Sequence, residues 1–334
     1  MINTAEQIAL SLLKTAEPGV DALVWLGVGH SRKGQLRIAL LGNDLLSGAA
    51  GAAILFAGLY TLTHEEQWRI SYLRAIRGPM KELAECLRTR NLFWTQDLDL
   101  FTGLSGLVLA LTLCAQLTGL NDCRSVLDAF LENAQNQIYS AKSDFGIIDL
   151  VYATQWANTA QDRWPGLAEA GARAAVELLS TDGNSFNSRV PLASISTIRD
   201  RAKWLLHLPI PTKPDIDSTP QSAHSRADLS RQKGPEILAQ GTLLQEMSFH
   251  RLLAELDDLA GSSADSHQDE LSAMLSEVQR RWVEKDLLER QGIPRGRYPS
   301  VVLGSGAIAW IILRASWRAL PSLRFPGVPR CIGG

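Results

Sequence analysis

The stretch that decides the fold is residues 44–60, which read DLLSGAAGAAILFAGLY. Its small residues lead into several turns that carry no charge. The same order of small residues followed by an apolar run recurs in residues 99–117, DLFTGLSGLVLALTLCAQL, and in residues 299–314, PSVVLGSGAIAWIILR. A helix that is apolar on every face must be buried on every face. These segments therefore predict the inner helices of a core.

Amphipathic segments alternate with these apolar ones. They place apolar residues at helical spacing on one face and charged residues on the other, and they span residues 6–15, 66–90, 124–140 and 267–290. Strand signals are poor, because no run alternates with period two and no Asn-Gly or Asp-Gly turn joins two such runs. The sequence therefore predicts an all-α fold in two layers, an inner set of helices shielded by an outer set. Its irregular internal repeat is typical of a helical array or ring.

The composition is that of an ordinary globular protein. The chain has 334 residues, 46% of them apolar, with 33 Lys and Arg against 35 Asp and Glu. This balance argues against a nucleic-acid binder that relies on a broad basic field. No window approaches eighteen uninterrupted apolar residues, and the N-terminus lacks the basic start and cleavage site of a secretory signal. We expect a soluble, cytoplasmic protein that neither enters a membrane nor binds nucleic acid.

We expect a single helical domain over residues 1–334. Residues 208–235 are rich in Pro, Ser and charge, which predicts a loop or partly disordered insertion. Residues 319–334 are punctuated by Pro and Gly, which predicts an irregular tail. Met1 suits a free-standing protein, although the same sequence also suits one domain of a longer protein.

Three segments together resemble a known family. GNDLLSGAAGAAILFAGLY (residues 42–60) is similar to the opening of the cyclase domain of class II lanthipeptide synthetases (LanM), within the lanthionine synthetase C-like (LanC-like) family. LFTGLSGLVLALTLCAQLTG (residues 100–119) resembles the next family repeat, and YPSVVLGSGAIAWIILRASWRALPS (residues 298–322) resembles the closing one. The resemblance implies an α/α toroid, here contracted or incomplete because the middle of the chain is shorter than in complete members.

The resemblance also implies a chemistry. Family members hold a zinc ion with two cysteines and one histidine, and the zinc activates a peptide thiol for addition to a dehydrated serine or threonine. The matching Cys-His-Gly motif here is Ala239, Gln240 and Gly241. Ser188 stands where the family has its acid histidine, and residues 219–232, the candidate for the Trp-Cys motif, contain no cysteine. Because alanine offers no lone pair and glutamine is a poor zinc ligand, we expect neither a metal nor another cofactor.

Some positions remain as site candidates. Asp149 matches the aspartate that the family assigns to proton transfer, and Tyr152 stands near it in place of a repeat glycine. We take both as weak catalytic candidates, although Asp149 could equally cap a helix. Trp94, Trp156 and Trp310 could line a peptide pocket, or they could be aromatic residues of the core.

The sequence therefore predicts a degenerate LanC-like protein of lanthipeptide or related ribosomal-peptide maturation. We expect a non-catalytic role, either holding a precursor peptide or docking to a partner modification enzyme. One alternative is a zinc-independent cyclase that closes thioether or related rings by positioning alone. Another is a helical-array binding module unrelated to peptide maturation.

Overall fold

The structure is a computed structural model. It describes residues 2–19, 21–30, 36–45, 48–88, 98–119, 121, 123–138, 146–156, 165–180, 198–199, 201–203, 205–206, 273, 305–317 and 320. These residues are mostly helical, which confirms the predicted fold class. The insertion predicted at residues 208–235 lies outside them, as does the tail at 319–334 apart from residue 320.

The apolar segments form inner helices. They are α2 (Ala49–Thr63), α5 (Leu104–Thr118), α7 (Gly146–Trp156) and α14 (Ser305–Ser316). Every residue of α2 from Ala49 to Leu59 is buried, and α5 is buried in the same way from Leu104 to Cys114. The rule that an all-round apolar helix must be surrounded on all sides is confirmed for both of these helices.

The amphipathic segments form the outer helices. They are α1 (Ile2–Lys14), α3 (Glu66–Arg88), α6 (Arg124–Ile138) and α8 (Pro165–Ser180). Helix α3 packs against α2 and α5, α6 packs against α5, and α8 packs against α7. The rings of Phe56 on α2 and Trp68 on α3 stack with their centroids 6.1 Å apart, which joins the two layers. The amphipathic helix predicted at residues 267–290 lies outside the described residues, apart from residue 273.

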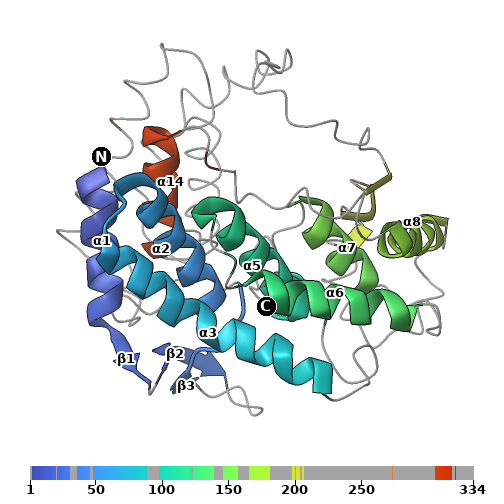
Figure 1. The fold of residues 1–334 in the computed structure, drawn as a ribbon, viewed down its shortest axis with the longest axis horizontal. Coiled ribbons are helices and arrows are strands. Elements are labelled where there is room, and N and C mark those ends of the chain that lie inside the picture. The colour runs from blue at the N-terminus through green and yellow to red at the C-terminus, as the bar shows by residue number, and fades with distance from the viewer. Residues whose placement is uncertain are drawn as a thin grey trace.

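Figure 1 shows the inner helices side by side in the order α14, α2, α5 and α7, although α14 comes from the far end of the chain. Helix α14 packs against both α1 and α2, so the C-terminal apolar segment returns to the N-terminal helices. The approach of α14 to α2 is close at Gly58, where an added Cβ would lie 2.7 Å from the Trp310 ring. The two-layer prediction is confirmed for these helices, whereas a closed toroid stays a prediction.

The helical prediction missed a small antiparallel sheet. Its strands are β1 (Ala16–Pro18), β2 (Leu23–His30) and β3 (Leu36–Leu40), paired in the order β1, β2, β3. The Trp25 indole of β2 is buried, and its Nε1 donates a hydrogen bond to the Leu12 carbonyl at the end of α1. The next residue, Leu26, is 40% exposed. Because β2 carries large apolar side chains on both faces, it lacks the apolar and polar alternation that reveals a strand in sequence.

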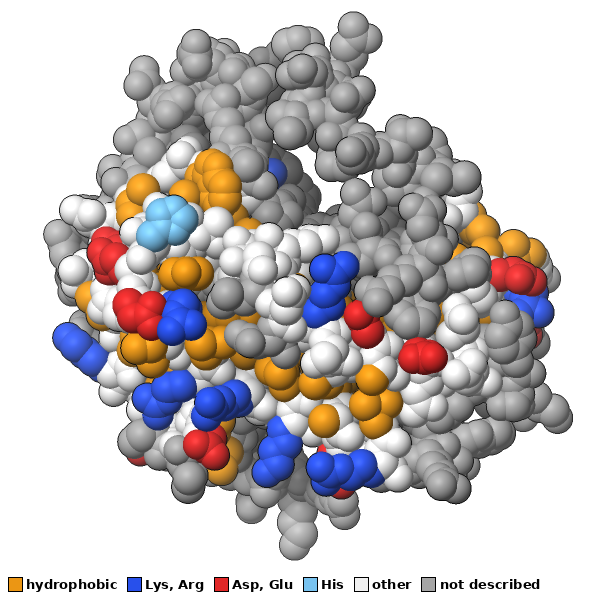
Figure 2. Space-filling model, viewed as in Figure 1, with side chains coloured by type: hydrophobic (Ala, Val, Ile, Leu, Met, Phe, Trp, Pro, Cys, Tyr) orange, Lys and Arg blue, Asp and Glu red, His pale blue; other side chains and the backbone are white. Residues whose placement is uncertain are grey.

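Basic and acidic side chains lie among one another on the outer surface (Figure 2). On α3, Arg69 pairs with Glu66 one turn earlier, and Arg77 pairs with Asp21 ahead of β2. Exposed pairs of this kind contribute little to stability because water screens them. None of the described helices is both long enough and apolar enough to cross a membrane.

Candidate functional site

Residues at or just before the starts of three inner helices are hydrogen-bonded to one another. The Leu45 amide, ahead of α2, donates to the Phe101 carbonyl ahead of α5 over 3.0 Å. The Leu100 amide donates to Oδ2 of Asp149 in the first turn of α7, also over 3.0 Å. These bonds bring together chain segments that are far apart in sequence. We take this junction as the candidate site, because the catalytic candidate Asp149 lies in it.

The segment ahead of α5 is shaped by its own side chains. Oδ1 of Asp99 accepts hydrogen bonds from the Phe101 and Thr102 amides, both over 2.8 Å, and one from the Thr102 hydroxyl. The Ser105 hydroxyl donates to the Leu98 carbonyl over 2.6 Å. An Asp side chain that accepts hydrogen bonds from the backbone amides two and three residues later stabilises a tight turn. Asp99 thereby presents the Leu100 amide to α7.

Close approach of this turn to α5 requires a glycine. A Cβ added to Gly106 would lie 2.3 Å from the Leu100 carbonyl oxygen, and that atom belongs to the backbone. It would also lie 3.0 Å from the Leu45 Cβ. A glycine is needed here because the backbone and a neighbouring side chain occupy the space that a Cβ would take. One of the glycines of the sequence repeat is therefore explained by the packing of the turn.

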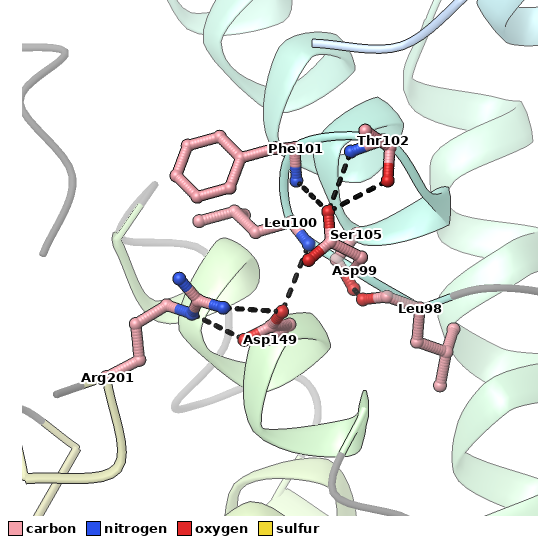
Figure 3. Close-up of polar contacts among 8 residues, drawn as sticks. All are labelled: Leu98, Asp99, Leu100, Phe101, Thr102, Ser105, Asp149 and Arg201. Atoms are coloured by element: carbon pink, nitrogen blue, oxygen red, sulfur yellow. Dashed lines mark hydrogen bonds and ion pairs between the residues drawn. The ribbon is translucent and has the colours of Figure 1, made fainter. Parts of the chain in front are cut away.

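Asp149 forms a buried ion pair that the sequence did not reveal (Figure 3). Its Oδ1 accepts from Nε of Arg201 over 2.5 Å, and its Oδ2 accepts from a terminal guanidinium nitrogen of Arg201 over 2.9 Å. Asp149 is 1% exposed and Arg201 is 0% exposed. The guanidinium carbon also lies 5.6 Å from the centroid of the Phe101 ring. Together with the Leu100 amide, Arg201 gives the carboxylate three hydrogen-bond donors.

The charge of Asp149 reflects a balance of opposing effects. The pKa of Asp149 is raised overall from 3.8 to about 6, and the largest cause is burial, because a charged carboxylate loses its hydration. The Arg201 guanidinium and the Leu100 amide lower that pKa, and the nearby Asp99 carboxylate raises it. Asp149 is therefore mainly ionised at neutral pH, and the positive charge of Arg201 balances its negative charge. This is the arrangement expected of a buried structural carboxylate that ties segments together.

Tyr152, the second catalytic candidate, lies on α7 three residues after Asp149. Its side chain is fully buried, and burial raises the pKa of its hydroxyl above the ordinary value of 10. The hydroxyl is therefore protonated at neutral pH and cannot act as a base. A catalytic role for either residue stays a prediction, since both side chains are covered by protein.

The remaining candidates lie in different places. Trp310 is 1% exposed in the contact between α14 and α2, where its ring is covered by protein. Trp156 is the last residue of α7. The structure gives no description of the other candidates, Trp94, Ser188, Ala239, Gln240 and Gly241, which lie outside the described residues. The peptide pocket therefore stays a prediction.

The loss of the zinc ligands that the resemblance implies stays a prediction, because the family match over residues 39–155 does not reach the motif positions. The resemblance assigns Ala239 and Gln240 to the positions of the family's cysteine and histidine, and neither residue type suits zinc. Among the residues that the structure describes, no group of three His, Cys, Asp or Glu side chains could hold a metal ion. We therefore derive no chemical step through zinc.

Comparison with known proteins agrees with the resemblance. Residues 39–155 match the family model of the lanthionine synthetase C-like protein. The matched region begins in β3 and ends in α7, so it contains the whole junction between the starts of α2, α5 and α7. This match supports the LanC-like family, which contains lanthipeptide-type cyclases. No curated protein matches the chain.

Arg201 is the residue that sequence reasoning missed. It lies 52 positions after its partner, and Arg in a short charged segment is usually solvated. No spacing rule links such distant residues, so only the folded chain identifies the pair. The single sequence signal was Asp149 itself, a carboxylate inside the apolar segment IIDLVYATQW.

Proposed function

We propose that this LanC-like protein acts in the maturation of a ribosomally made peptide of the lanthipeptide type, as a binding protein that does not close rings itself. Its partner is either the precursor peptide or an enzyme that modifies that peptide. The proposal takes its setting from the family match over residues 39–155. The non-catalytic role is inferred from the burial and ion pairing of the Asp149 carboxylate.

The ion pair of Asp149 with Arg201 is the observation that carries the proposal. A general base must reach the proton that it removes, directly or through one water. Both oxygens of Asp149 instead accept hydrogen bonds from protein donors, and the side chain is 1% exposed. The carboxylate therefore serves to join α7 to the turn ahead of α5. The residue types at positions 239 and 240 agree with this, because they offer no zinc ligand to activate a thiol.

A zinc-independent cyclase is the second candidate, and one observation favours it. The pKa of Asp149 is raised to about 6. A general base is most effective when its pKa lies near the pH at which the enzyme works, and 6 is close to neutral pH. Positioning a thiol beside a dehydrated residue could supply much of the rate of an intramolecular addition. This function requires Asp149 to leave Arg201 when substrate binds.

Two measurements on the full chain separate these functions. The probe is a synthetic peptide with one cysteine and one dehydrobutyrine, joined to the leader of a lanthipeptide precursor. Isothermal titration calorimetry measures its binding, and mass spectrometry after iodoacetamide treatment measures ring closure, because a closed thioether no longer reacts. We expect binding without ring closure. Absence of binding at high peptide concentration would refute the peptide-binding role and leave only docking to an enzyme, and faster loss of free thiol than in buffer would establish the cyclase.

Matched variants sharpen the second measurement. Asp149→Asn keeps the shape of the side chain but removes its charge, and Glu132→Gln makes the same change at an exposed position of α6. If the protein is a cyclase, Asp149→Asn slows ring closure and Glu132→Gln does not. If it only binds the peptide, neither variant changes the rate of thioether formation.

A further inference from the structure

Strand β3 forms one edge of the small antiparallel sheet, away from the junction at Asp149. Among the described residues it pairs only with β2, which itself packs against α2 and α3. The sheet lies below α1 in the view of Figure 1. One end of the β2–β3 pair is open to solvent, because Leu40 is 64% exposed and its cross-strand partner Leu26 is 40% exposed. An apolar edge strand of this kind is a template for pairing with another chain.

The register shows which backbone groups of β3 point to the open edge. The Leu41 amide, one residue beyond β3, donates to the Trp25 carbonyl over 2.7 Å, which makes these two residues a hydrogen-bonded pair. Hydrogen-bonded and non-hydrogen-bonded pairs alternate along an antiparallel ladder. Leu36, Ile38 and Leu40 therefore belong to non-hydrogen-bonded pairs with β2. Their backbone amides and carbonyls point away from β2, toward the edge of the sheet.

These three residues are placed symmetrically in the strand. Because β3 runs from Leu36 to Leu40, Ile38 is its central residue. A second β3 laid antiparallel along this edge would put Ile38 opposite Ile38 of the second copy, and Leu36 opposite Leu40 of that copy. Every outward amide then meets an outward carbonyl, which gives about six main-chain hydrogen bonds, two for each of the three pairs. The edge is therefore complementary to itself, as a twofold-symmetric interface requires.

Charge permits this pairing, and the other edge of the sheet does not offer it. Arg37 is the one charged residue of β3. It would stand opposite Ala39 of the second copy, so like charges are not directly opposed. Strand β1, at the other edge, has three residues and includes Glu17 and Pro18. A short edge strand with a proline, which has no amide to donate, resists pairing. Pairing therefore stops at two copies.

From this self-complementary edge, we propose that two copies of the chain associate through their β3 strands and join their two three-stranded sheets into one continuous sheet. The association buries the exposed apolar residues at the end of the β2–β3 pair. The paired segments are short, and interfaces that bury less than about 1,200 Å² belong to weak and transient complexes. The dimer therefore forms at micromolar concentrations and dissociates on dilution.

The first test is sedimentation equilibrium of the full chain over a series of micromolar concentrations. Leu40→Lys places a charge at the paired edge, and Ile70→Lys makes a matched change at a side chain that is 49% exposed on α3. We expect Ile70→Lys to dimerise like the unchanged chain, and Leu40→Lys to weaken the dimer by about tenfold. A chain that is monomeric at every concentration would overturn the proposal, as would equal dissociation constants for the two variants. Circular dichroism during heating checks that each variant folds.

Cross-linking with the oxidant diamide tests the register. The parent is Cys331→Ser, whose remaining cysteines are buried. Ile38→Cys puts two thiols at directly opposed positions, whose Cα atoms lie about 5.5 Å apart in a hydrogen-bonded pair, within the span of a disulfide. Ala39→Cys is the control, because it puts them at diagonal positions about 7–8 Å apart. We expect a disulfide-linked dimer for Ile38→Cys and far less for Ala39→Cys. Equal cross-linking of the two would overturn pairing through β3.

The alternative occupant of this edge is the precursor peptide, added as a further strand. Calorimetry with the peptide probe described above distinguishes the two. If the chain stays monomeric while the probe binds the unchanged chain and does not bind Leu40→Lys, the edge belongs to the peptide and the dimer is overturned.

Discussion

Replacing Arg201 by Met tests the buried ion pair. The substitution keeps an unbranched side chain but leaves the Asp149 carboxylate in a site where it is 1% exposed and still accepts a hydrogen bond from the Leu100 amide. Breaking a buried pair by removing one partner costs about 3–5 kcal/mol, because an uncompensated charge stays buried. That is a large share of the roughly 5–15 kcal/mol that stabilises a typical protein.

The structure provides a matched control on the surface. Arg77 pairs with Asp21 over 3.3 Å, but the two side chains are 57% and 77% exposed. Removing one partner of an exposed pair usually costs less than about 1 kcal/mol. Arg77→Met should therefore change the free energy of unfolding by several kcal/mol less than Arg201→Met does.

The assay is urea unfolding at pH 7.5, followed by circular dichroism. Comparing the midpoints at equal slope gives the change in stability. The double variant with Asp149→Leu and Arg201→Met should be more stable than Arg201→Met alone because no charge is left buried. The destabilisation by Arg201→Met should also shrink at acidic pH, where Asp149 is neutral. A loss below about 1 kcal/mol for Arg201→Met, equal to that for Arg77→Met, would refute the reasoning.

Other predictions concern charge and packing. The pKa of Asp149 is about 6 in the folded protein and 3.8 ordinarily, so the native state binds this proton more tightly than the unfolded state does. The group therefore adds stability as the pH falls from 6 toward 3.8. Asp149→Asn should remove this gain in stability from urea midpoints measured between these pH values. Gly106→Ala should destabilise by about 1–3 kcal/mol in the same assay, because its Cβ would meet the Leu100 carbonyl. Unchanged stability of Gly106→Ala would contradict the close approach of the Leu100 carbonyl to Gly106. Trp310→Ala should cost about 3–5 kcal/mol through the cavity left beside Gly58, and a thermal melt equal to that of the unchanged chain would contradict this.

The sequence alone was sufficient for the helical layers. Residues 44–60 and 99–117 carry no charged side chain beyond their first residue, so burial of most of α2 and α5 follows from composition. The charged face of residues 66–90 likewise required α3 to lie outside them. The strands could not be predicted, because β1 has three residues and β2 is apolar on both faces. Their pairing depends on contacts with α1, such as the bond from Trp25 to Leu12.

The tertiary structure decided the state of the candidate site. The sequence identified Asp149 as a carboxylate in an apolar helix, but a lone carboxylate is compatible with a base, a cap or an ion pair. Its role depends on which groups surround it, and those groups come from Arg201 and from the turn at Asp99 and Leu100. Local patterns determine whether a segment is helical because the interactions that form a helix span a few residues. The partner of a buried charge is set by packing between distant segments, so it emerges only when the chain has folded.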